Sequence, residues 1–172
     1  LALRTLALFG SPAQQARWLR PIARAEVPAA FALTEPDHGS DSVSLETVAR
    51  REPAGDGGGW VLRGTKKWIG NGAAGGVTFV WARVDDDGSD DHGAVRCFLV
   101  EQDTPGYTGT VITGKGALRG IHQAHIPLDD VRLPADAVLP GARTFRDAST
   151  VLYSTRSGVA WSALGHATAC YE

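Results

Sequence analysis

Residues 31–41 hold the side chains whose types and spacing best suit binding chemistry. An apolar start runs directly into Thr34, and a turn rich in proline, glycine and serine follows, with Gly39 and Ser40 within it. Hydroxyl groups and the backbone amides of such a turn are donors for polar or anionic groups. The segment is therefore a candidate ligand contact, and a purely structural turn is the alternative.

A glycine pattern at residues 70–75 has the spacing G-x-G-x-x-G. In dinucleotide-binding proteins this pattern opens a helix. Here the residues from Val77 to Trp81 are all β-branched or aromatic, which predicts a strand. The pattern is therefore not a dinucleotide fingerprint.

The aspartate-rich run at residues 85–91 does not fit a calcium loop. Aligning Gly88 with the glycine that such loops require puts Arg83 at the first ligand position and Ala94 at the last. Neither side chain is a calcium ligand. We expect a solvated hairpin tip instead.

Two histidines, His122 and His125, lie near Asp129 and raise the question of a metal site. Their odd spacing in a strand sends the two side chains to opposite faces, and no further ligand cluster accompanies them. Serine, histidine and aspartate also occur together at residues 37–41, but neighbours in sequence rarely form a catalytic triad and no G-x-S-x-G turn is present. We predict neither a metal site nor a hydrolase.

The elements that would position these residues are mostly short strands separated by turn residues. The expected strands cover residues 31–34, 44–51, 60–63, 67–69, 77–84, 94–101, 108–113, 123–126 and 131–133. Their regular spacing predicts an antiparallel β-barrel or sandwich. Residues 55–59 and 85–91 are the expected hairpin tips.

Residues 1–28 predict helical structure. Ser11, Pro12 and Gln14 have the types expected of an N-cap, a first helical residue and the third residue of a capping box. Apolar residues recur behind them at helical spacing. We expect Pro21 to end or kink this helix.

Strand signals stop after the turn at residues 140–141, and the chain is helical in pattern from about residue 150 to its end. The layout is therefore a β-domain over residues 29–142 between helical segments at residues 1–28 and 143–172. Each helical segment would expose an apolar face if nothing else covered it. Because the chain begins at Leu1 and contains no methionine, we expect it to be a fragment.

Composition narrows the class of protein. The 172 residues carry a formal net charge of −2, with 43% hydrophobic and 21% charged residues, which is typical of a packed globular domain and does not indicate a nucleic-acid partner. Two cysteines cannot form a disulfide framework or a zinc site, and no apolar stretch reaches the roughly 20 residues of a membrane helix. These observations predict a cytoplasmic protein with no membrane partner.

Several segments together resemble the acyl-CoA dehydrogenase family. The matching residues are Phe31, Leu33, Thr34, Glu35 and Pro36, then Gly39, Ser40 and Asp41, then Gly64 to Asn71, Lys115 to Arg119 and Val131 to Pro134. They follow the family's order and span essentially the whole chain. The resemblance implies a mainly β middle domain at residues 29–142, the end of an N-terminal helical domain at residues 1–28 and a truncated C-terminal helical domain at residues 143–172.

The implied activity is the flavin-dependent α,β-dehydrogenation of an acyl-CoA thioester, with FAD as cofactor. Residues 139–141 and 156–161 are similar to those of glutaryl-CoA dehydrogenases and plant peroxisomal short-chain acyl-CoA oxidases, which implies a short-chain or glutaryl-CoA-like substrate. The implied electron acceptor is an electron-transferring flavoprotein or oxygen, and the implied assembly is a homodimer or homotetramer. The family's catalytic glutamate lies in the C-terminal helical domain, so we expect no catalytic residue in this chain and no turnover by it alone.

The resemblance also assigns binding residues. The implied cofactor contacts are Phe31, Leu33, Thr34, Gly39, Ser40, Trp68, Ile69 and Gly70. Among them, the Thr34 hydroxyl would bond the polar edge of the flavin, and Ser40 would also approach the pantetheine arm of the substrate. Arg156 would contribute to the acyl-CoA site and Arg119 to its edge or to structure. We expect Lys66 and Lys67 to be surface charges on a strand. Without the surrounding motif, the Trp68 residue type alone would predict a buried aromatic side chain in a strand.

Gly70 departs from the family pattern, because many members have threonine at this position. A hydroxyl bond from this residue to the flavin is therefore impossible here, which leaves oxidase chemistry open. Two further alternatives stay open as well. One is a non-catalytic FAD- or CoA-binding subunit of a split complex, and the other is a β-barrel that binds no ligand.

Overall fold

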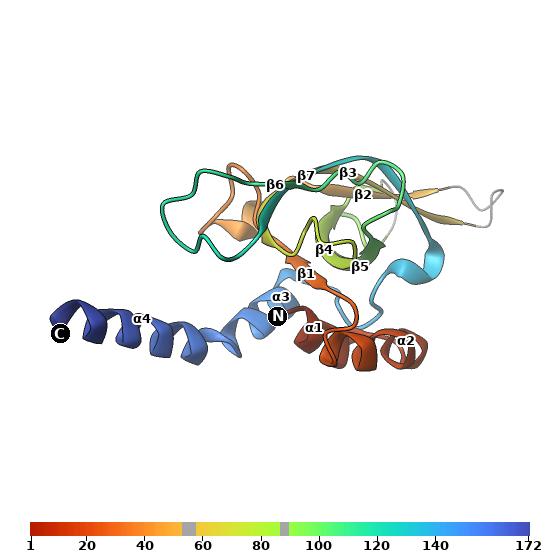
Figure 1. Ribbon diagram of the computed structural model, residues 1–172. Helices are drawn as coiled ribbons and strands as arrows, with labels where there is room; N and C mark the ends of the chain where they lie inside the picture. Colours follow the sequence, from red (N-terminus) through yellow and green to blue (C-terminus); the bar gives the residue numbers. More distant parts are fainter. Residues whose placement is uncertain (53–57, 87–89) are drawn as a thin grey trace.

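The computed structural model of the protein describes residues 1–52, 58–86 and 90–172. Within these residues, a curled β-domain rests on helices, and the last helix extends away from the body (Figure 1). The two expected hairpin tips lie partly outside the described residues, at positions 55–57 and 87–89. No helix among the described residues is both long and apolar enough to span a bilayer.

The elements follow the predicted order of helices, strands and helices. Helices α1 (Ala2–Phe9) and α2 (Pro12–Ala23) precede strands β1 (Ala29–Ala32), β2 (Val48–Glu52), β3 (Gly59–Gly70), β4 (Val77–Val84), β5 (Val95–Glu101), β6 (Thr110–Val111) and β7 (Gln123–Pro134). Helices α3 (Phe145–Tyr153) and α4 (Arg156–Tyr171) end the chain, and short 3-10 turns lie at η1 (Ser42–Ser44) and η3 (Ala135–Ala137). The mainly β fold with flanking helices is thus confirmed, whereas the domain boundaries at residues 28 and 142 stay predictions.

The strands form one mixed sheet, in which β4 pairs with β5 on one side and with β1 and β2 on the other. Strand β2 continues the sheet to β3, β7 and β6 through antiparallel pairs. The prediction of antiparallel pairing is wrong for β1 and β2, which both run parallel to β4. Parallel neighbours need a long crossover connection, and here the chain between β1 and β4 includes the whole β2–β3 hairpin.

Two pairs of expected short strands merge into long ones. Residues 60–63 and 67–69 belong to β3, and residues 123–126 and 131–133 belong to β7. The pairing of β3 with β7 shifts register between Leu62 and Gly64 and again between Lys66 and Ile69. Such bulges bend a strand without ending it, so turn-like residues occur within one continuous strand.

The core has two layers, one on each face of β4. One cluster fills the inside of the curled sheet, where Trp60 of β3 packs edge-on against Phe98 of β5 with ring centroids 5.1 Å apart. The other lies between the outer face of β4 and β5 and the helices. Strand β4 is buried along almost its full length because both faces are covered.

Helix α2 begins as predicted. The Ser11 side chain accepts a hydrogen bond from the Gln14 backbone amide, and the Gln14 side chain accepts one from the Ser11 amide. The Gln14 side-chain amide also donates to the Asp136 carbonyl at 2.7 Å, which docks the helix on η3. Pro21 lies in the last turn, and the helix ends two residues later at Ala23.

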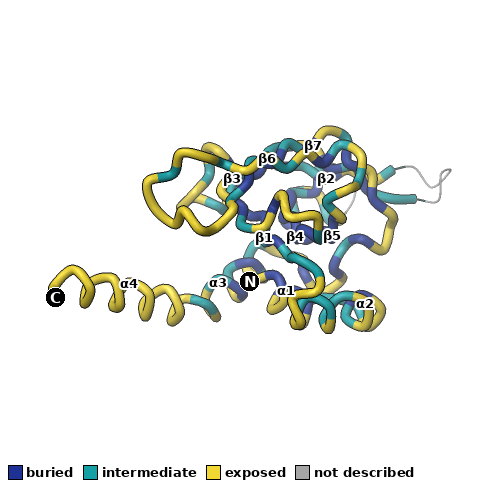
Figure 2. The backbone as a smooth tube through the Cα atoms, viewed as in Figure 1, coloured by how far each residue is buried: buried dark blue, intermediate teal, exposed yellow. Residues whose placement is uncertain are grey.

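Helix α4 is exposed along its whole length (Figure 2). Its large apolar and aromatic side chains, Val159, Trp161, Leu164 and Tyr171, are between 55% and 94% exposed. The C-terminal segment therefore leaves large apolar side chains uncovered, as expected, but they are spread around the helix and do not form one face.

Candidate functional site

An open pocket of about 470 Å³ lies where β1, the end of β3 and the loop after β1 meet. It is lined by Leu1, Ala2, Ala29, Phe31, Leu33, Thr34, Gly39, Ser42, Trp68, Ile69, Gly70, Asn71, Ile121 and Leu152. The structure therefore brings together every residue implied as a cofactor contact except Ser40. These residues come from segments more than 25 positions apart in sequence, so the tertiary fold is what places them at one site.

Strand β1 and the residues after it form one wall of the pocket. Phe31 lines the pocket and packs against Trp81 with ring centroids 6.0 Å apart, whereas Ala32 points into the core. The Thr34 carbonyl accepts a hydrogen bond from the Lys67 amide at 3.0 Å, which joins this wall to β3. In the part of the chain that the structure describes, the half-buried Thr34 hydroxyl has no partner, so it is available to a ligand.

Trp68 forms a second wall of the pocket and is not the buried strand aromatic that the residue alone predicted. Its side chain is 46% exposed, and its φ of 64° lies in the left-handed region. A bulky residue rarely adopts this conformation unless its surroundings impose it. The residue lies in the bulge between Lys66 and Ile69, and this bulge turns the ring outward.

Two glycines leave open space at the pocket. A Cβ atom added to Gly70 would contact only Ile121 Cγ2, at 3.7 Å, and one added to Gly39 would meet no atom within 4 Å. Packing within the described protein therefore does not demand glycine at either position. The space beside Gly70 and the exposed Trp68 ring together suit a flat group that approaches the backbone closely.

Behind this pocket lies a buried ion pair that sequence reasoning missed. Lys66 is fully buried, and its Nζ lies 2.8 Å from Glu35 Oε1 and 3.1 Å from the Leu33 carbonyl oxygen. The expectation that Lys66 is a surface charge is therefore wrong. The error arises because lysine is usually a surface residue, whereas Lys66 continues the alternation of buried side chains that Trp60 and Leu62 begin along β3.

The electrostatics of this pair follow from burial and from mutual attraction. Burial lowers the pKa of Lys66 to about 8, and the charge of Glu35 acts against that shift. Burial by itself would raise the pKa of Glu35, but Lys66 and hydrogen bonds from Glu46 and Thr47 lower it below 4.5. Glu35 is therefore ionised at neutral pH, and its negative charge is compensated where it lies.

The two residues expected to contact substrate do not line this pocket. Ser40 is exposed in the loop after β1. Arg156 is exposed at the start of α4, with its guanidinium 5.8 Å from the Tyr153 ring centroid, and Leu152 of the preceding helix is the nearest pocket residue along the chain. Arg119 lines a neighbouring pocket, which shares Ile121 with the first one.

Some pocket residues carry no signal in the sequence. Ala29, Ile121 and Leu152 are ordinary residues that only the tertiary fold brings to the site. For Glu35 and Lys66 a signal was available, because both lie within the matching segments. Across the described ranges, no group of three or more histidine, cysteine, aspartate or glutamate side chains is arranged to hold a metal ion.

The fold is a curled β-domain with an open pocket whose exposed Trp68 ring and open backbone suit a flat group. Residues 30–131 match the family described as "Acyl-CoA dehydrogenase, middle domain". Over its full length the chain is 36% identical to the short-chain specific acyl-CoA dehydrogenase, mitochondrial, of Rattus norvegicus, of which it covers 40%.

Solved structures agree with this match. A glutaryl-CoA dehydrogenase from Mycobacterium smegmatis in complex with FADH2 superposes with a TM-score of 0.87 at 39% identity, over 96% of this chain and 40% of that one. The butyryl-CoA dehydrogenase from Megasphaera elsdenii superposes with a TM-score of 0.83 at 30% identity, over 96% of this chain and 42% of that one. The chain belongs to the acyl-CoA dehydrogenase family, and it spans about 40% of the length of these relatives.

Proposed function

We propose that this chain supplies the FAD- and CoA-contacting β-domain of an enzyme that dehydrogenates the α,β-bond of an acyl-CoA thioester. The observation that carries the proposal is the single pocket that gathers Phe31, Leu33, Thr34, Gly39, Trp68, Ile69 and Gly70. Relatives named for short-chain substrates, butyryl-CoA and glutaryl-CoA support a short-chain or glutaryl-CoA-like acyl group. The solved relative with FADH2 supports FAD as the cofactor.

The pocket fits a flavin in shape and in donors. Bound FAD would supply the acceptor for the hydride that leaves the β-carbon of the thioester. The exposed Trp68 ring would pack against the flat ring system, and the backbone at Ile69 and Gly70 would lie beside its reactive edge. The free Thr34 hydroxyl would donate to the polar edge and stabilise negative charge that develops there.

Gly39 and Ser40 would meet the more polar parts of the ligands. Both lie in the exposed loop after β1, where backbone amides and the Ser40 hydroxyl are accessible to a pyrophosphate or to the pantetheine arm. Arg156 would contact the acyl-CoA from the start of α4, one turn beyond the pocket residue Leu152. The base that removes the α-proton is not among the residues that we assign to this site.

Partners of the complete protein are part of the same proposal. An electron-transferring flavoprotein or oxygen would reoxidise the flavin, and the exposed apolar side chains of α4 would be covered in a homo-oligomer or by further helices. The cytoplasmic location stays a prediction, and several of the relatives are named as mitochondrial proteins.

The test uses the product of the complete gene. The protein is purified, its visible absorbance is recorded, butyryl-CoA or glutaryl-CoA is added without air, and oxygen is then admitted. A yellow protein that bleaches with acyl-CoA and stays reduced in oxygen until an acceptor is added supports a dehydrogenase. Rapid return of the colour with formation of peroxide identifies an oxidase instead.

Two other outcomes would contradict the proposal. A protein that binds FAD but does not bleach with either acyl-CoA, until a partner chain is supplied, would be a binding subunit of a split complex. A colourless protein that FAD cannot reconstitute would be a β-barrel without this ligand.

A further inference from the structure

The buried pair Glu35–Lys66 is a charged cluster that the proposed function does not use. Neither side chain lines the pocket, and the two are only 4% and 0% exposed. Burying an ion pair rarely stabilises a fold more than apolar residues of the same size would. Stability alone therefore does not explain why charges lie at this place.

Lys66 holds the wall of the pocket that carries Thr34. Its Nζ donates to the Leu33 carbonyl oxygen at 3.1 Å, and the backbone amide of the next residue, Lys67, donates to the Thr34 carbonyl oxygen at 3.0 Å. Two consecutive carbonyl groups of this wall are thus bound to β3. The peptide that leads into Thr34 has little freedom to rotate.

Glu35 holds the other end of the same segment. Its carboxylate accepts hydrogen bonds from Lys66 Nζ at 2.8 Å, from Thr47 Oγ1 at 2.6 Å and from the Thr47 and Glu46 amides at 2.9 and 2.6 Å. Every donor lies on β3 or just before β2. The carboxylate therefore fixes the loop after β1 to both strands.

The same pair lies next to the bulge that presents Trp68. Lys66 is the last residue before the register shift with β7, and Trp68 follows two residues later with its left-handed φ of 64°. A strained conformation persists only where its surroundings fix it on both sides. The two pocket walls therefore meet at Lys66.

We propose that the Glu35–Lys66 pair positions the flavin by setting the separation and orientation of Thr34 relative to Trp68. The inference rests on the proposed function, in which this pocket holds FAD. Glu35 and Lys66 are positioning residues, because they act through the backbone at residues 33–35 and through the bulge at residues 67–68. Loss of the pair changes how the flavin is held and not whether the sheet forms.

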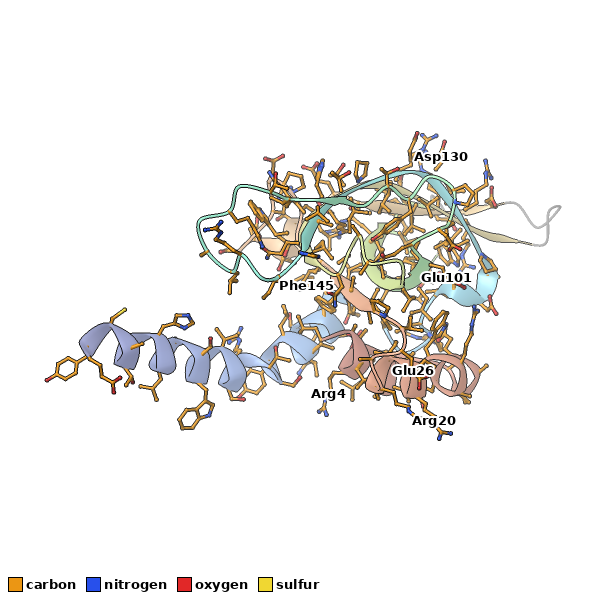
Figure 3. All side chains as sticks on the ribbon, viewed as in Figure 1. Arg4, Arg20, Glu26, Glu101, Asp130 and Phe145 are labelled. Carbon is orange, nitrogen blue, oxygen red and sulfur yellow. The ribbon has the colours of Figure 1, made fainter. Side chains whose placement is uncertain are left out.

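The test compares the complete gene product with the double variant Glu35→Gln/Lys66→Met. Both charges are removed together, since removing one would leave a lone buried charge and destabilise the fold. The matched control is Arg63→Met, which breaks the exposed ion pair of Arg63 with Asp130 on the same strand β3. Asp130 lies on the side of the molecule opposite helices α1 and α2 (Figure 3).

We expect the double variant to fold, as judged by circular dichroism and thermal melting, and to bind FAD on the order of tenfold more weakly. The visible band and the reduction potential of the bound FAD should shift, which a purely structural pair would not cause. The Arg63→Met control should match the parent protein in all three measurements.

Each remaining outcome decides the question. A double variant with the parent's FAD affinity, spectrum and potential would overturn the positioning role and leave the proposed function standing. A parent protein that does not bind FAD would overturn the proposed function itself. If the double variant fails to fold, Thr47→Val replaces it, because this change removes only the hydroxyl donor to Glu35. A smaller shift of the same spectrum supports the role, and an unchanged spectrum overturns it.

Discussion

Trp68 combines two features that a residue serving only the core rarely shows. Nearly half of its side chain is exposed, and its backbone lies in the left-handed region. An exposed aromatic ring buries little apolar area, so the ring itself does little to stabilise the isolated domain. A ligand that packs on the ring would account for the left-handed backbone of Trp68, because this conformation turns the ring toward the pocket.

We expect Trp68→Ala in the complete gene product to release FAD or shift its visible spectrum. The unfolding free energy should change by less than about 1 kcal/mol, because the ring is half exposed. Trp60→Ala is the matched control, since Trp60 is 1% exposed in the core and its loss should cost about 3–5 kcal/mol. Absorbance and thermal melting check both. An unchanged spectrum with full activity in Trp68→Ala would refute the assignment.

Gly70 permits a test of oxygen access at the residue scale. The backbone there accepts a side chain, because an added Cβ would contact only Ile121 Cγ2, at 3.7 Å. We expect Gly70→Thr to fold normally and to slow the reoxidation of the reduced flavin by oxygen, since its side chain fills space beside the flavin edge. Stopped-flow mixing of the reduced protein with oxygen measures the rate. A rate equal to that of the parent would show that this position does not control access.

At the scale of elements, the site depends on how β1 and β3 are joined. Strand β3 contains two register shifts against β7, and the second one lies between Lys66 and Ile69. Lys66 lies on the inner side of this bulge and Trp68 on the outer side, so one short segment supplies both a buried charge and an exposed ring. The segment after β1 is therefore held to β3 both by the Glu35–Lys66 ion pair and by a backbone hydrogen bond from Lys67 to Thr34.

The Glu35–Lys66 ion pair predicts that the stability of the fold decreases at acid pH. The folded state lowers the pKa of Glu35 below 4.5, so the unfolded chain takes up a proton first as the pH falls. The stabilisation is complete above pH 4.5 and is lost as the pH falls through the lowered pKa. At neutral pH we expect Glu35→Gln to lower the unfolding free energy by about 3 kcal/mol.

Urea unfolding at neutral pH and at several values below 4.5 measures this dependence. The difference between parent and Glu35→Gln should shrink as the pH falls. The hydrogen bond to Glu46 raises the pKa of the nearby His38, so a His38→Gln variant serves as the control. A difference that stays constant with pH would mean that Glu35 is not ionised in the folded protein.

At the scale of the whole molecule, the described chain consists of a packed β-domain with helices α1 to α3 and an exposed helix, α4, that extends from it. Helix α4 leaves the β-domain and makes no extended contact with it (Figure 2). Because α4 and the pocket are both open to solvent, they leave room for further protein to pack on them. We predict that a site for both cofactor and substrate lies between this domain and whatever covers it.

Arg156 tests that arrangement, because it lies at the start of α4 and outside the pocket. We expect Arg156→Ala in the complete gene product to weaken acyl-CoA binding by on the order of tenfold while FAD stays bound. Titration of the flavin spectrum with acyl-CoA measures the affinity. The exposed Arg146 on α3 provides the control variant, Arg146→Ala. Loss of FAD without a change in acyl-CoA affinity would place Arg156 elsewhere.

Much of the fold follows from local patterns. The capping box of α2, the strand at residues 77–84 and the helical ends are confirmed because each depends on neighbours within a few positions. The pocket residues in the matching segments were also predicted, although their roles stay predictions. By contrast, the parallel pairing of β1 with β4 and the merging of short strands into β3 and β7 depend on contacts between distant segments.

The sequence by itself therefore determined which elements form and which family the chain resembles, because hydrophobic period, turn residues and motif order are local properties. Only the tertiary structure decided that Lys66 is buried against Glu35 and that Trp68 is exposed. Lys66 precedes the bulge in β3, and its burial depends on partners from the distant segment of residues 33–35. For Trp68 the physical reason is the bulge itself. One extra residue reverses the alternation of faces, and whether a bulge forms depends on pairing with β7, about 60 residues further along the chain.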